Sequence, residues 1–376
     1  MDRTNRQEIS PAYDPWESIH HRIAHGRDLL TSVEFTVTHQ CNLRCEHCAV
    51  GEDLLVGEPD GRIPLHLLLE RLDEIEHLET ISITGGEPLF NHEMVRDYVV
   101  PLLRYAHNRG AKTQLNSNLT LALDRYEEIL PFLDVMHISF NYVSAEDFYR
   151  ITFARMPHKV SYSQAEKIFH RLVENTRKLA DMGVFVSAES MISIRTKEKI
   201  CEIHRWVYEM GCRRHEVHPL YPSDFARDMP LLSLEELRDA YHRLLDAHIP
   251  NLWILFGTLP FYPCSGIDED LQLIKRIHRT PHVTVRNDPD GHIRLNVNVF
   301  SGDVIVTDFG DVGPLGNVKE DRLEDCLLRW QSHELFRPYR CFCPQSRCNG
   351  PSLLVAKTYY PDVDFSVRKG ISISSD

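Results

Sequence analysis

The sequence lacks long apolar runs: it contains no stretch of roughly 18 apolar residues, the least that a membrane-spanning helix needs. Its first 22 residues are polar and have no segment like the apolar core of a signal peptide. Internal repeats and low-complexity linkers are also absent. We therefore expect a cytoplasmic protein with no membrane partner. Its 376 residues suffice for one large domain and a smaller one.

Basic residues are also fewer than acidic residues. The chain has 42 Lys and Arg residues against 55 Asp and Glu residues, for a net charge of −13. Nonspecific nucleic-acid binding depends on basic side chains that neutralise phosphates. The charge balance disfavours such binding, and we expect no nucleic-acid partner. A cationic or neutral substrate fits this chain better.

Cysteines, in contrast, are grouped. Cys41, Cys45 and Cys48 lie in THQCNLRCEHCAVG, a C-x3-C-x2-C loop that follows a strand-like segment. Three thiolates are one fewer than the usual four ligands, so an iron–sulfur cluster held here would keep one iron open to a non-protein ligand. A structural zinc site would instead need His39 or His47 as its fourth ligand. Only one CxxC pair is present, whereas zinc signatures commonly use two, and this favours the cluster.

A second motif follows about forty residues later. A β-branched strand runs into Gly85, Gly86 and Glu87 within TISITGGEPLF. The glycines let the backbone approach a ligand closely, and Glu87 offers a carboxylate at the end of the strand. Alone, this segment could be an ordinary turn. Together with the cysteine loop, it resembles the radical S-adenosylmethionine (SAM) superfamily.

The resemblance assigns a role to each motif. It implies a [4Fe–4S] cluster on Cys41, Cys45 and Cys48, with SAM bound to the open iron through its amino and carboxylate groups. It places the Gly-Gly-Glu segment beside the methionine end of SAM, and the backbone of His47 beside adenine. SAM would be cleaved reductively to methionine and a 5′-deoxyadenosyl radical, which takes a hydrogen atom from the substrate. A reducing partner such as flavodoxin or ferredoxin would supply the electron.

Strand-like runs alternate with helical patterns along the chain. Six βα units predict a parallel sheet covered by helices, with function at the carboxyl ends of the strands. Ser233 and Glu236 form a capping-box pattern, and Gly110 and Gly183 stand where helices end. The family resemblance specifies a partial (β/α)6 TIM-like barrel. The expected strands are 33–37, 80–84, 112–115, 135–140, 184–189 and 216–218, and the expected helices begin at Pro64 or cover 161–182, 196–210 and 233–248.

Two later strand ends resemble further family motifs. Ser117 and Asn118 lie in QLNSNLTLA, while Ser139 and Asn141 lie in MHISFNYVSAEDF. The resemblance implies that these side chains contact the ribose and carboxylate of SAM. The alternative is that the two asparagines only close βα turns. Leu119 stands where the family has glycine, and Asn141 stands where it has aspartate.

Three further residues of interest lie outside these motifs. Glu189 ends the fifth strand and is either a cofactor contact or a structural partner of Arg195. Cys201 follows the apolar face of a helix and is expected in the core. Cys212 precedes the sixth strand and is either another buried thiol or a hydrogen-atom donor inside the barrel.

A second cysteine group lies near the C-terminus. Cys341, Cys343 and Cys348 form the C-x-C-x4-C pattern of RCFCPQSRCNGP. A predicted hairpin around 288–291, a GNV turn and a helix precede it. This order resembles the SPASM and twitch extensions of radical SAM enzymes, which carry auxiliary iron–sulfur clusters. Asn296 occupies a cysteine position of those extensions, and no cysteine follows Cys348, so one auxiliary cluster is expected.

The fourth ligand of that cluster has two candidates. Cys264 lies in a loop bounded by proline and glycine, where the extensions have their first cysteine, and we favour it. Cys326 shares a helical face with apolar residues, a pattern typical of core packing. The C-x-C-x4-C tail is most similar to that of the YfkAB-type subfamily.

The expected divisions are an N-terminal extension over residues 1–30, the barrel over 31–257 and the auxiliary cluster domain over 258–376. Relatives with SPASM extensions often modify peptides, so a peptide or protein substrate is the first hypothesis and a small molecule is the alternative. A nonenzymatic iron–sulfur electron carrier or redox sensor is a further alternative. It would need no Gly-Gly-Glu motif and no open iron.

Overall fold

The computed structural model describes residues 7–156, 158, 160–286, 291–306 and 312–368. Its centre is one sheet of 11 strands in the order β11-β10-β9-β1-β2-β3-β4-β5-β6-β7-β8. Each pair of neighbours from β9 to β8 is parallel, whereas β10 pairs antiparallel with both β9 and β11. The strands are β1 (Ser32–Thr36), β2 (Thr80–Thr84), β3 (Lys112–Ser117), β4 (Val135–Ser139), β5 (Phe185–Ile192), β6 (Arg214–Pro219), β7 (Trp253–Gly257), β8 (Val283–Arg286), β9 (Arg294–Asn298), β10 (Asp303–Ile305) and β11 (Gly316–Asn317).

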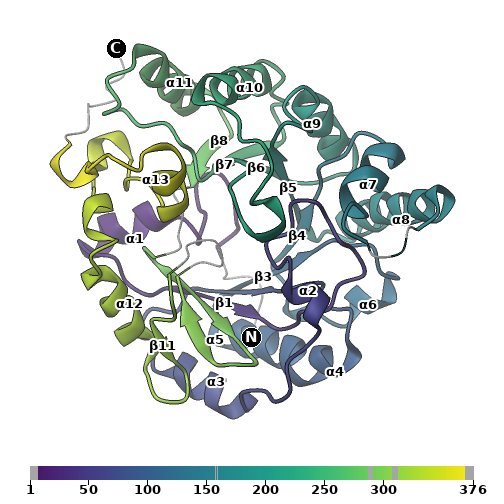
Figure 1. Ribbon diagram of the computed structural model, residues 1–376. Coiled ribbons are helices and arrows are strands. Elements are labelled where there is room, and N and C mark those ends of the chain that lie inside the picture. Colours follow the sequence, from purple (N-terminus) through teal and green to yellow (C-terminus); the bar gives the residue numbers. More distant parts are fainter. Residues whose placement is uncertain (1–6, 157, 159, 287–290, 307–311, 369–376) are drawn as a thin grey trace.

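Helices surround this curved sheet (Figure 1). Those that connect the parallel strands form an outer layer, while α1, α12 and α13 lie on the side between β8 and β11. The longer connecting helices are α3 (Leu65–Asp73), α5 (Val100–Arg109), α7 (Ala145–Thr152), α8 (Tyr162–Asp181), α9 (Ile200–Glu209), α10 (Leu234–Asp246) and α11 (Asp268–Arg279). Shorter helices are α2 (Asp53–Val56), α4 (His92–Met94) and α6 (Asp124–Glu127), and the flanking ones are α1 (Ser18–His25), α12 (Leu323–Ser332) and α13 (Leu353–Tyr359).

Side chains alternate along the strands between an apolar outer face and a polar interior. In β1, Val33 and Phe35 are buried in the main hydrophobic core beneath the helices. Glu34 points the other way, and it accepts a hydrogen bond from Asn116 of β3, two strands away. Such a contact crosses the concave side of the sheet. The interior of the barrel is therefore lined with polar side chains.

The amino end of the barrel is closed by the segment that precedes α1. Trp16 packs in a buried cluster with Val135, Phe185 and Trp253, which are the first residues of β4, β5 and β7. The indole N–H of Trp16 also donates to the Ser82 hydroxyl at 3.2 Å. This plug leaves the carboxyl ends of the strands as the open mouth.

The α/β class, the partial barrel and all six predicted strands are confirmed. The parallel part is larger than predicted, because β7 and β8 extend it beyond β6. Ser233 and Glu236 form the expected capping box, and Gly110 ends α5 in the left-handed conformation. The helix predicted from Thr196 begins only at Ile200.

The predicted hairpin around 288–291 is wrong. Its turn falls mainly on residues 287–290, which lie outside the described residues, but the flanking strands are separated. Strand β8 pairs with β7, whereas β9 pairs with β1 and β10. The antiparallel hairpin is formed one step later, where Val297 of β9 lies opposite Val304 of β10. Pairing with the free edge of β1 buries β9, which a two-stranded hairpin could not do.

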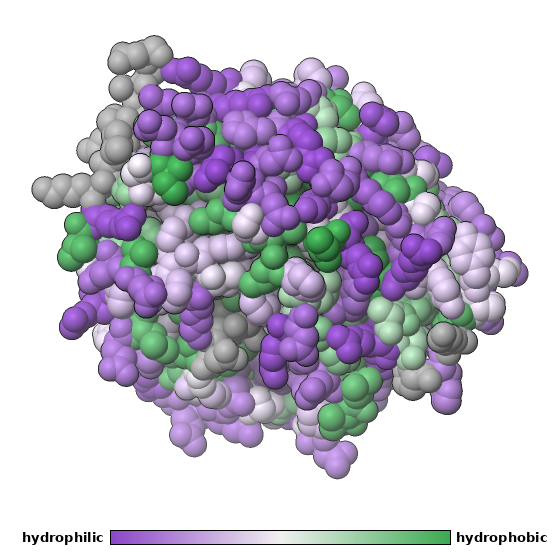
Figure 2. All heavy atoms as spheres, turned by 45° about the horizontal axis from the view of Figure 1, so that its top comes forward, coloured by the Kyte–Doolittle hydropathy of each residue, from purple (hydrophilic) through white to green (hydrophobic). Residues whose placement is uncertain are grey.

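The surface is mainly polar. Figure 2 shows a largely hydrophilic face on which apolar side chains occur in scattered groups. Within the described ranges, no helix is both long enough and apolar enough to span a bilayer.

Candidate active site

The cysteine loop leaves the carboxyl end of β1 at the mouth of the barrel. The backbone N–H of Leu43 donates to the Cys41 sulfur at 3.3 Å. The Arg44 guanidinium donates to the carbonyl oxygens of Cys41 and Leu43, both at 2.7 Å, and so keeps the loop compact. Burial, followed by the negative charge of neighbouring groups, raises the pKa of Cys41 to about 12, and burial also raises the pKa of Cys45 and Cys48. Electrostatic interactions among the three cysteines contribute to these pKa shifts, and no disulfide joins them.

The Gly-Gly-Glu turn packs directly against this loop. The N–H of Gly86 donates to the carbonyl oxygen of Thr38 at 2.8 Å, and the N–H of Glu87 donates to that of Gln40 at 2.7 Å. A Cβ on Gly86 would lie 2.3 Å from the Gln40 oxygen, and one on Gly85 would lie 2.3 Å from the Thr38 oxygen. Gly85 also has a φ of 132°. Both glycines are thus required for contact between the turn and the cysteine loop.

Glu87 is fully buried and joins β2 to the end of β3. Its carboxylate accepts the Ser117 hydroxyl, at 2.9 and 3.0 Å from the two oxygens, and the Asn118 N–H at 2.8 Å. Burial raises the pKa of Glu87 to about 7, although these donors act in the opposite direction. The carboxylate therefore braces two of the predicted cofactor-binding residues. Its expected contact with the amino group of SAM stays a prediction.

The structure brings Asn118 to the cysteine loop. Its side-chain amide donates to the Cys41 sulfur at 3.6 Å and to the Asn42 oxygen at 3.0 Å. The next residue, Leu119, is buried and has a φ of 53°, in the region that glycine favours. Leu119, which stands where the family resemblance expects glycine, thus has a backbone conformation typical of glycine.

The two candidates at the end of β4 differ in their surroundings. Ser139 is half-buried and lies beside Glu189 in the register of β4 and β5. The Asn141 side-chain oxygen accepts the N–H of Met191 at 2.8 Å and so ties the β4 end to β5. This bond is of the turn-closing kind, although Asn141 also borders the cavity described next.

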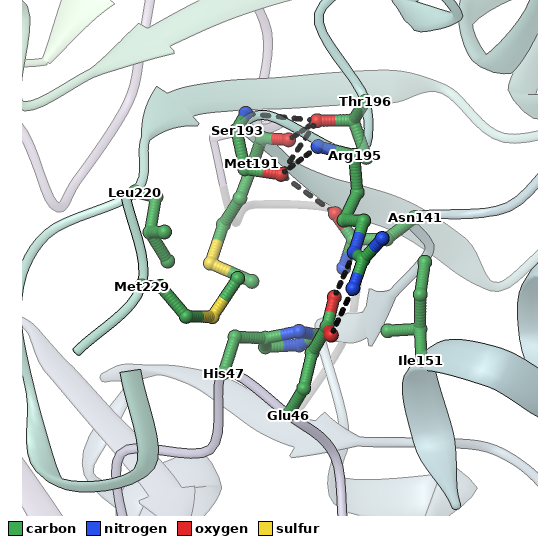
Figure 3. Close-up of a pocket in the computed structure, with 10 residues that line it drawn as sticks. All are labelled: Glu46, His47, Asn141, Ile151, Met191, Ser193, Arg195, Thr196, Leu220 and Met229. Carbon is green, nitrogen blue, oxygen red and sulfur yellow. Dashed lines mark hydrogen bonds and ion pairs between the residues drawn. The ribbon is translucent and has the colours of Figure 1, made fainter. Parts of the chain in front are cut away.

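A small cavity opens between the cysteine loop and the ends of β4 and β5 (Figure 3). In this view His47 lies below the side chains of Met191 and Met229. Burial lowers the pKa of His47 to about 4, so its ring is neutral at physiological pH. The cavity is lined by Glu46, His47, Asn141, Ile151, Met191, Ser193, Arg195, Thr196, Leu220 and Met229.

His39, one of the two histidines considered as a fourth zinc ligand, has an aromatic neighbour. His39 packs against Phe300, with 5.1 Å between ring centroids. Over the described part of the chain, no three His, Cys, Asp or Glu side chains are placed to hold a single metal ion.

Glu189 lies inside the barrel mouth with two histidines, His137 and His218, that the sequence analysis did not identify. Glu189 accepts from His218 at 2.9 Å, and its other oxygen lies 3.5 Å from a ring nitrogen of His137. The suggested pairing of Glu189 with Arg195 is wrong, because Arg195 binds Glu46 at 3.2 Å instead. The alternation of polar residues in RHEVH, which starts at Arg214, was the available signal, since alternate residues of a strand share one face.

The C-terminal cysteines form a second group, away from the loop. Cys343 and Cys348 make a two-residue β-bridge, and the sulfurs of Cys341 and Cys343 are 3.9 Å apart. Cys264 packs in the same cluster and interacts electrostatically with the other three. Burial raises the pKa of Cys341 and Cys348 to about 12.

The remaining cysteines are elsewhere. Cys326 is buried in the main core on α12, near Gly316 rather than the tail. Cys201 packs against the α10 side of the barrel, and Cys212 is buried just before β6, at the amino end of that strand. Of the two candidate fourth ligands, only Cys264 lies with the tail cysteines.

Comparison with known proteins agrees with this geometry. Residues 35–207 match the Radical SAM superfamily, and residues 220–370 match the YfkB-like domain. The protein YfkA of Bacillus subtilis (strain 168) is 52% identical over 370 residues, which cover 98% of this chain and 99% of YfkA.

Solved structures share the fold at low sequence identity. Streptococcus suis SuiB bound to S-adenosylmethionine has a TM-score of 0.60 and 14% identity, and the similarity covers 92% of this chain and 78% of SuiB. SuiB has also been solved with its precursor peptide SuiA. The anSMEcpe protein with bound AdoMet and the Cp18Cys peptide has a TM-score of 0.57 and 12% identity, covering 89% of this chain and 92% of that one. The chain is therefore a radical SAM superfamily enzyme that belongs to the family of YfkA and has a YfkB-like C-terminal domain.

Proposed function

We propose that this enzyme cleaves SAM reductively and abstracts a hydrogen atom from a peptide or protein substrate. One observation carries the proposal: the three-thiol loop is held against the Gly-Gly-Glu turn at the open end of the barrel. Radical chemistry by SAM and an iron–sulfur cluster depends on the protein for orientation and for exclusion of competing reactions. The barrel mouth offers both.

The residues fit a [4Fe–4S] cluster. Cys41, Cys45 and Cys48 are soft sulfur donors on one loop, and no disulfide engages them. When bound, the cluster and SAM would supply an electron and a 5′-deoxyadenosyl radical. Arg44 holds the loop backbone, and Leu43 already provides one N–H to a ligand sulfur. A loop braced in this way needs little rearrangement when the cluster binds.

SAM would bind beside this loop. The backbone at Gly85 and Gly86, the hydroxyl of Ser139 and the cavity beside His47 are its proposed contacts. The cavity combines the thioethers of Met191 and Met229 and the neutral imidazole of His47 with the Glu46–Arg195 ion pair, so it offers both apolar surface and polar groups to the adenosine part of SAM. Glu87 and Ser117 support this site indirectly, because their side chains are hydrogen-bonded to each other.

The tail would hold one auxiliary cluster. Cys264, Cys341, Cys343 and Cys348 supply four thiols, the usual complement for a [4Fe–4S] centre. The aromatic side chains of Tyr262 and Phe365 pack in the same cluster. Such a centre could accept an electron from the substrate radical or bind the substrate.

The fold similarity to SuiB and anSMEcpe, both solved with peptides, supports a peptide substrate, since it covers 93% and 89% of this chain. A small-molecule substrate is the second candidate. It is favoured by the Glu189–His218 pair, which presents charge inside the mouth where a compact polar ligand could reach it. An electron carrier would have no need for a cofactor cavity beside the cysteine loop.

Anaerobic reconstitution with iron and sulfide, followed by addition of SAM and reduced flavodoxin, tests the proposal. Wild type should release 5′-deoxyadenosine. Cys45→Ala should not, and it should bind less iron, because two thiolates cannot hold the cluster. Cys201→Ala is the matched control, since Cys201 lies in neither cysteine group. Equal SAM cleavage by wild type and Cys45→Ala would refute the cluster assignment.

A further inference from the structure

Three polar side chains form a closed hydrogen-bond ring beside Cys41. The Asn118 amide donates to the Asn42 oxygen at 3.0 Å, and the Asn42 amide donates to the Thr120 hydroxyl at 2.8 Å. The Thr120 hydroxyl donates in turn to the Asn118 oxygen at 2.6 Å. Asn42 belongs to the cysteine loop, whereas Asn118 and Thr120 follow β3. The ring therefore connects the loop to the barrel wall.

The ring fixes which end of the Asn118 amide faces the sulfur. The backbone N–H of Thr120 also donates to the Asn118 oxygen, at 3.0 Å. A backbone N–H can only donate, so the oxygen must lie on that side. The NH2 group is thus directed at the Cys41 sulfur, 3.6 Å away.

The backbone beyond β3 holds the ring members in position. Leu119 adopts its φ of 53° between Asn118 and Thr120, so both of those side chains turn back toward the loop. A leucine in this conformation costs roughly 1–2 kcal/mol. Its buried side chain and the two hydrogen bonds of the Asn175 amide, to the carbonyl oxygens of Leu119 and Leu121, offset that cost.

We infer that Asn118 is a positioning residue for the loop cluster and raises its reduction potential through the hydrogen bond to the Cys41 sulfur. Reduction adds negative charge to a cluster and its sulfurs, and a donor to sulfur stabilises that charge. The side chain of Asn118 then makes its hydrogen bonds to other residues of the protein. This assigns it a role other than the SAM contact that the family resemblance implies. The inference rests on the proposed function, because it requires a cluster on Cys41.

The test is an EPR-monitored redox measurement on the reconstituted full-length protein. The loop cluster is identified as the one whose signal changes when SAM is added. Asn118→Ala should shift its midpoint potential to more negative values while iron content stays at the wild-type level. Asn116→Ala is the matched control, because Asn116 lies two residues earlier, in β3, and bonds Glu34 and Gln114 rather than a thiol.

Two further variants keep the test decisive if Asn118→Ala loses the cluster. Asn118→Asp preserves shape but replaces the donor with a second acceptor, and it should lower the potential more strongly. Thr120→Val leaves the donor but opens the ring, and it should lower the potential less. An unchanged potential in Asn118→Asp would overturn the inference. The inference would also be overturned if Asn118→Ala bound SAM more weakly while the cluster potential stayed unchanged. That result would indicate that Asn118 contacts SAM instead.

Failure of the proposed function gives a different result. In that case wild type would show no SAM-responsive cluster, and its iron content would match that of Cys45→Ala. A cluster that responds to SAM but whose potential is insensitive to position 118 would refute the inference alone.

Discussion

His218 and Glu189 form an ion pair inside the barrel mouth, with 2.9 Å between the imidazole Nε2 and a carboxylate oxygen. The other ring nitrogen of His218, Nδ1, lies 2.8 Å from the carbonyl oxygen of Pro219. Both ring nitrogens face acceptors, an arrangement that favours the doubly protonated imidazolium. Burial would lower the pKa of His218, but the hydrogen bond and charge of Glu189 outweigh it and raise the pKa.

The pair should give stability a characteristic pH dependence. Because the pKa of His218 is raised by folding, His218 stabilises the folded protein fully below its pKa in the unfolded chain, about 6.5. This stabilisation is lost as the pH rises through the pKa of His218 in the folded protein. Burial would raise the pKa of Glu189, but hydrogen bonds from His137 and His218 hold it well below its usual value. The stabilisation by Glu189 is lost only as the pH falls through the lowered pKa of Glu189. The stability difference between wild type and His218→Gln should therefore be largest between about pH 4.5 and 6.5.

Urea unfolding at a series of pH values measures this difference. His66→Gln is the control, because His66 is exposed on α3. A wild-type minus His218→Gln difference that does not change between pH 5 and 9 would mean that His218 is not an imidazolium.

Gly86→Ala should prevent assembly of the loop cluster. The new Cβ would lie 2.3 Å from the Gln40 carbonyl oxygen and 3.2 Å from the Cys41 Cβ, and the first contact is with backbone that has no room to move. We expect the cysteine loop to be displaced and the iron content after reconstitution to fall. Gly313→Ala is the matched control, since a Cβ there meets nothing within 4 Å. Equal iron content in the two variants would contradict the packing role of Gly86.

Cys264→Ser and Cys326→Ser discriminate between the candidate fourth ligands. Cys264 lies with the tail cysteines, while Cys326 lies in the main core. Iron and sulfide analysis should show a loss in Cys264→Ser and none in Cys326→Ser. The triple alanine variant of Cys341, Cys343 and Cys348 should lose about four irons and keep SAM cleavage. If the wild type holds only about four irons per chain, or one zinc in the tail, the tail cysteines form a structural metal site rather than an auxiliary cluster.

Glu87→Ala and Glu87→Gln separate a structural role from a charge contact. Alanine leaves the Ser117 hydroxyl and the Asn118 N–H without their acceptor, which should cost about 1–3 kcal/mol of unfolding free energy. Glutamine can accept from Asn118 and donate to Ser117, so it should cost less. Urea unfolding and SAM binding by the reconstituted variants are the measurements. If Glu87→Gln is stable but binds SAM weakly, the carboxylate charge contacts SAM; if both variants bind SAM like wild type, it does not.

Much of the fold follows from short-range chemistry. Five-residue strands such as Thr80–Thr84 are β-branched and apolar, and the capping box at Ser233 satisfies the first amides of α10 with its own neighbours. The C-x3-C-x2-C loop is equally local, since its spacing alone keeps three thiols together. These features depend on residues within a few positions of one another and could be predicted from the sequence.

Pairings between distant segments were decided by the tertiary structure. Strand β9 lies beside β1 rather than β8 because the edge of β1 offers it a parallel partner and a buried face. The family resemblance favoured Cys264 over Cys326 as the partner of the tail cysteines, but only the packing of α13 and its neighbours brings that loop to them. His218 and Glu189 meet because adjacent parallel strands place their carboxyl ends side by side. No spacing along the chain encodes such contacts, since each depends on which strand edges and side-chain faces are buried together.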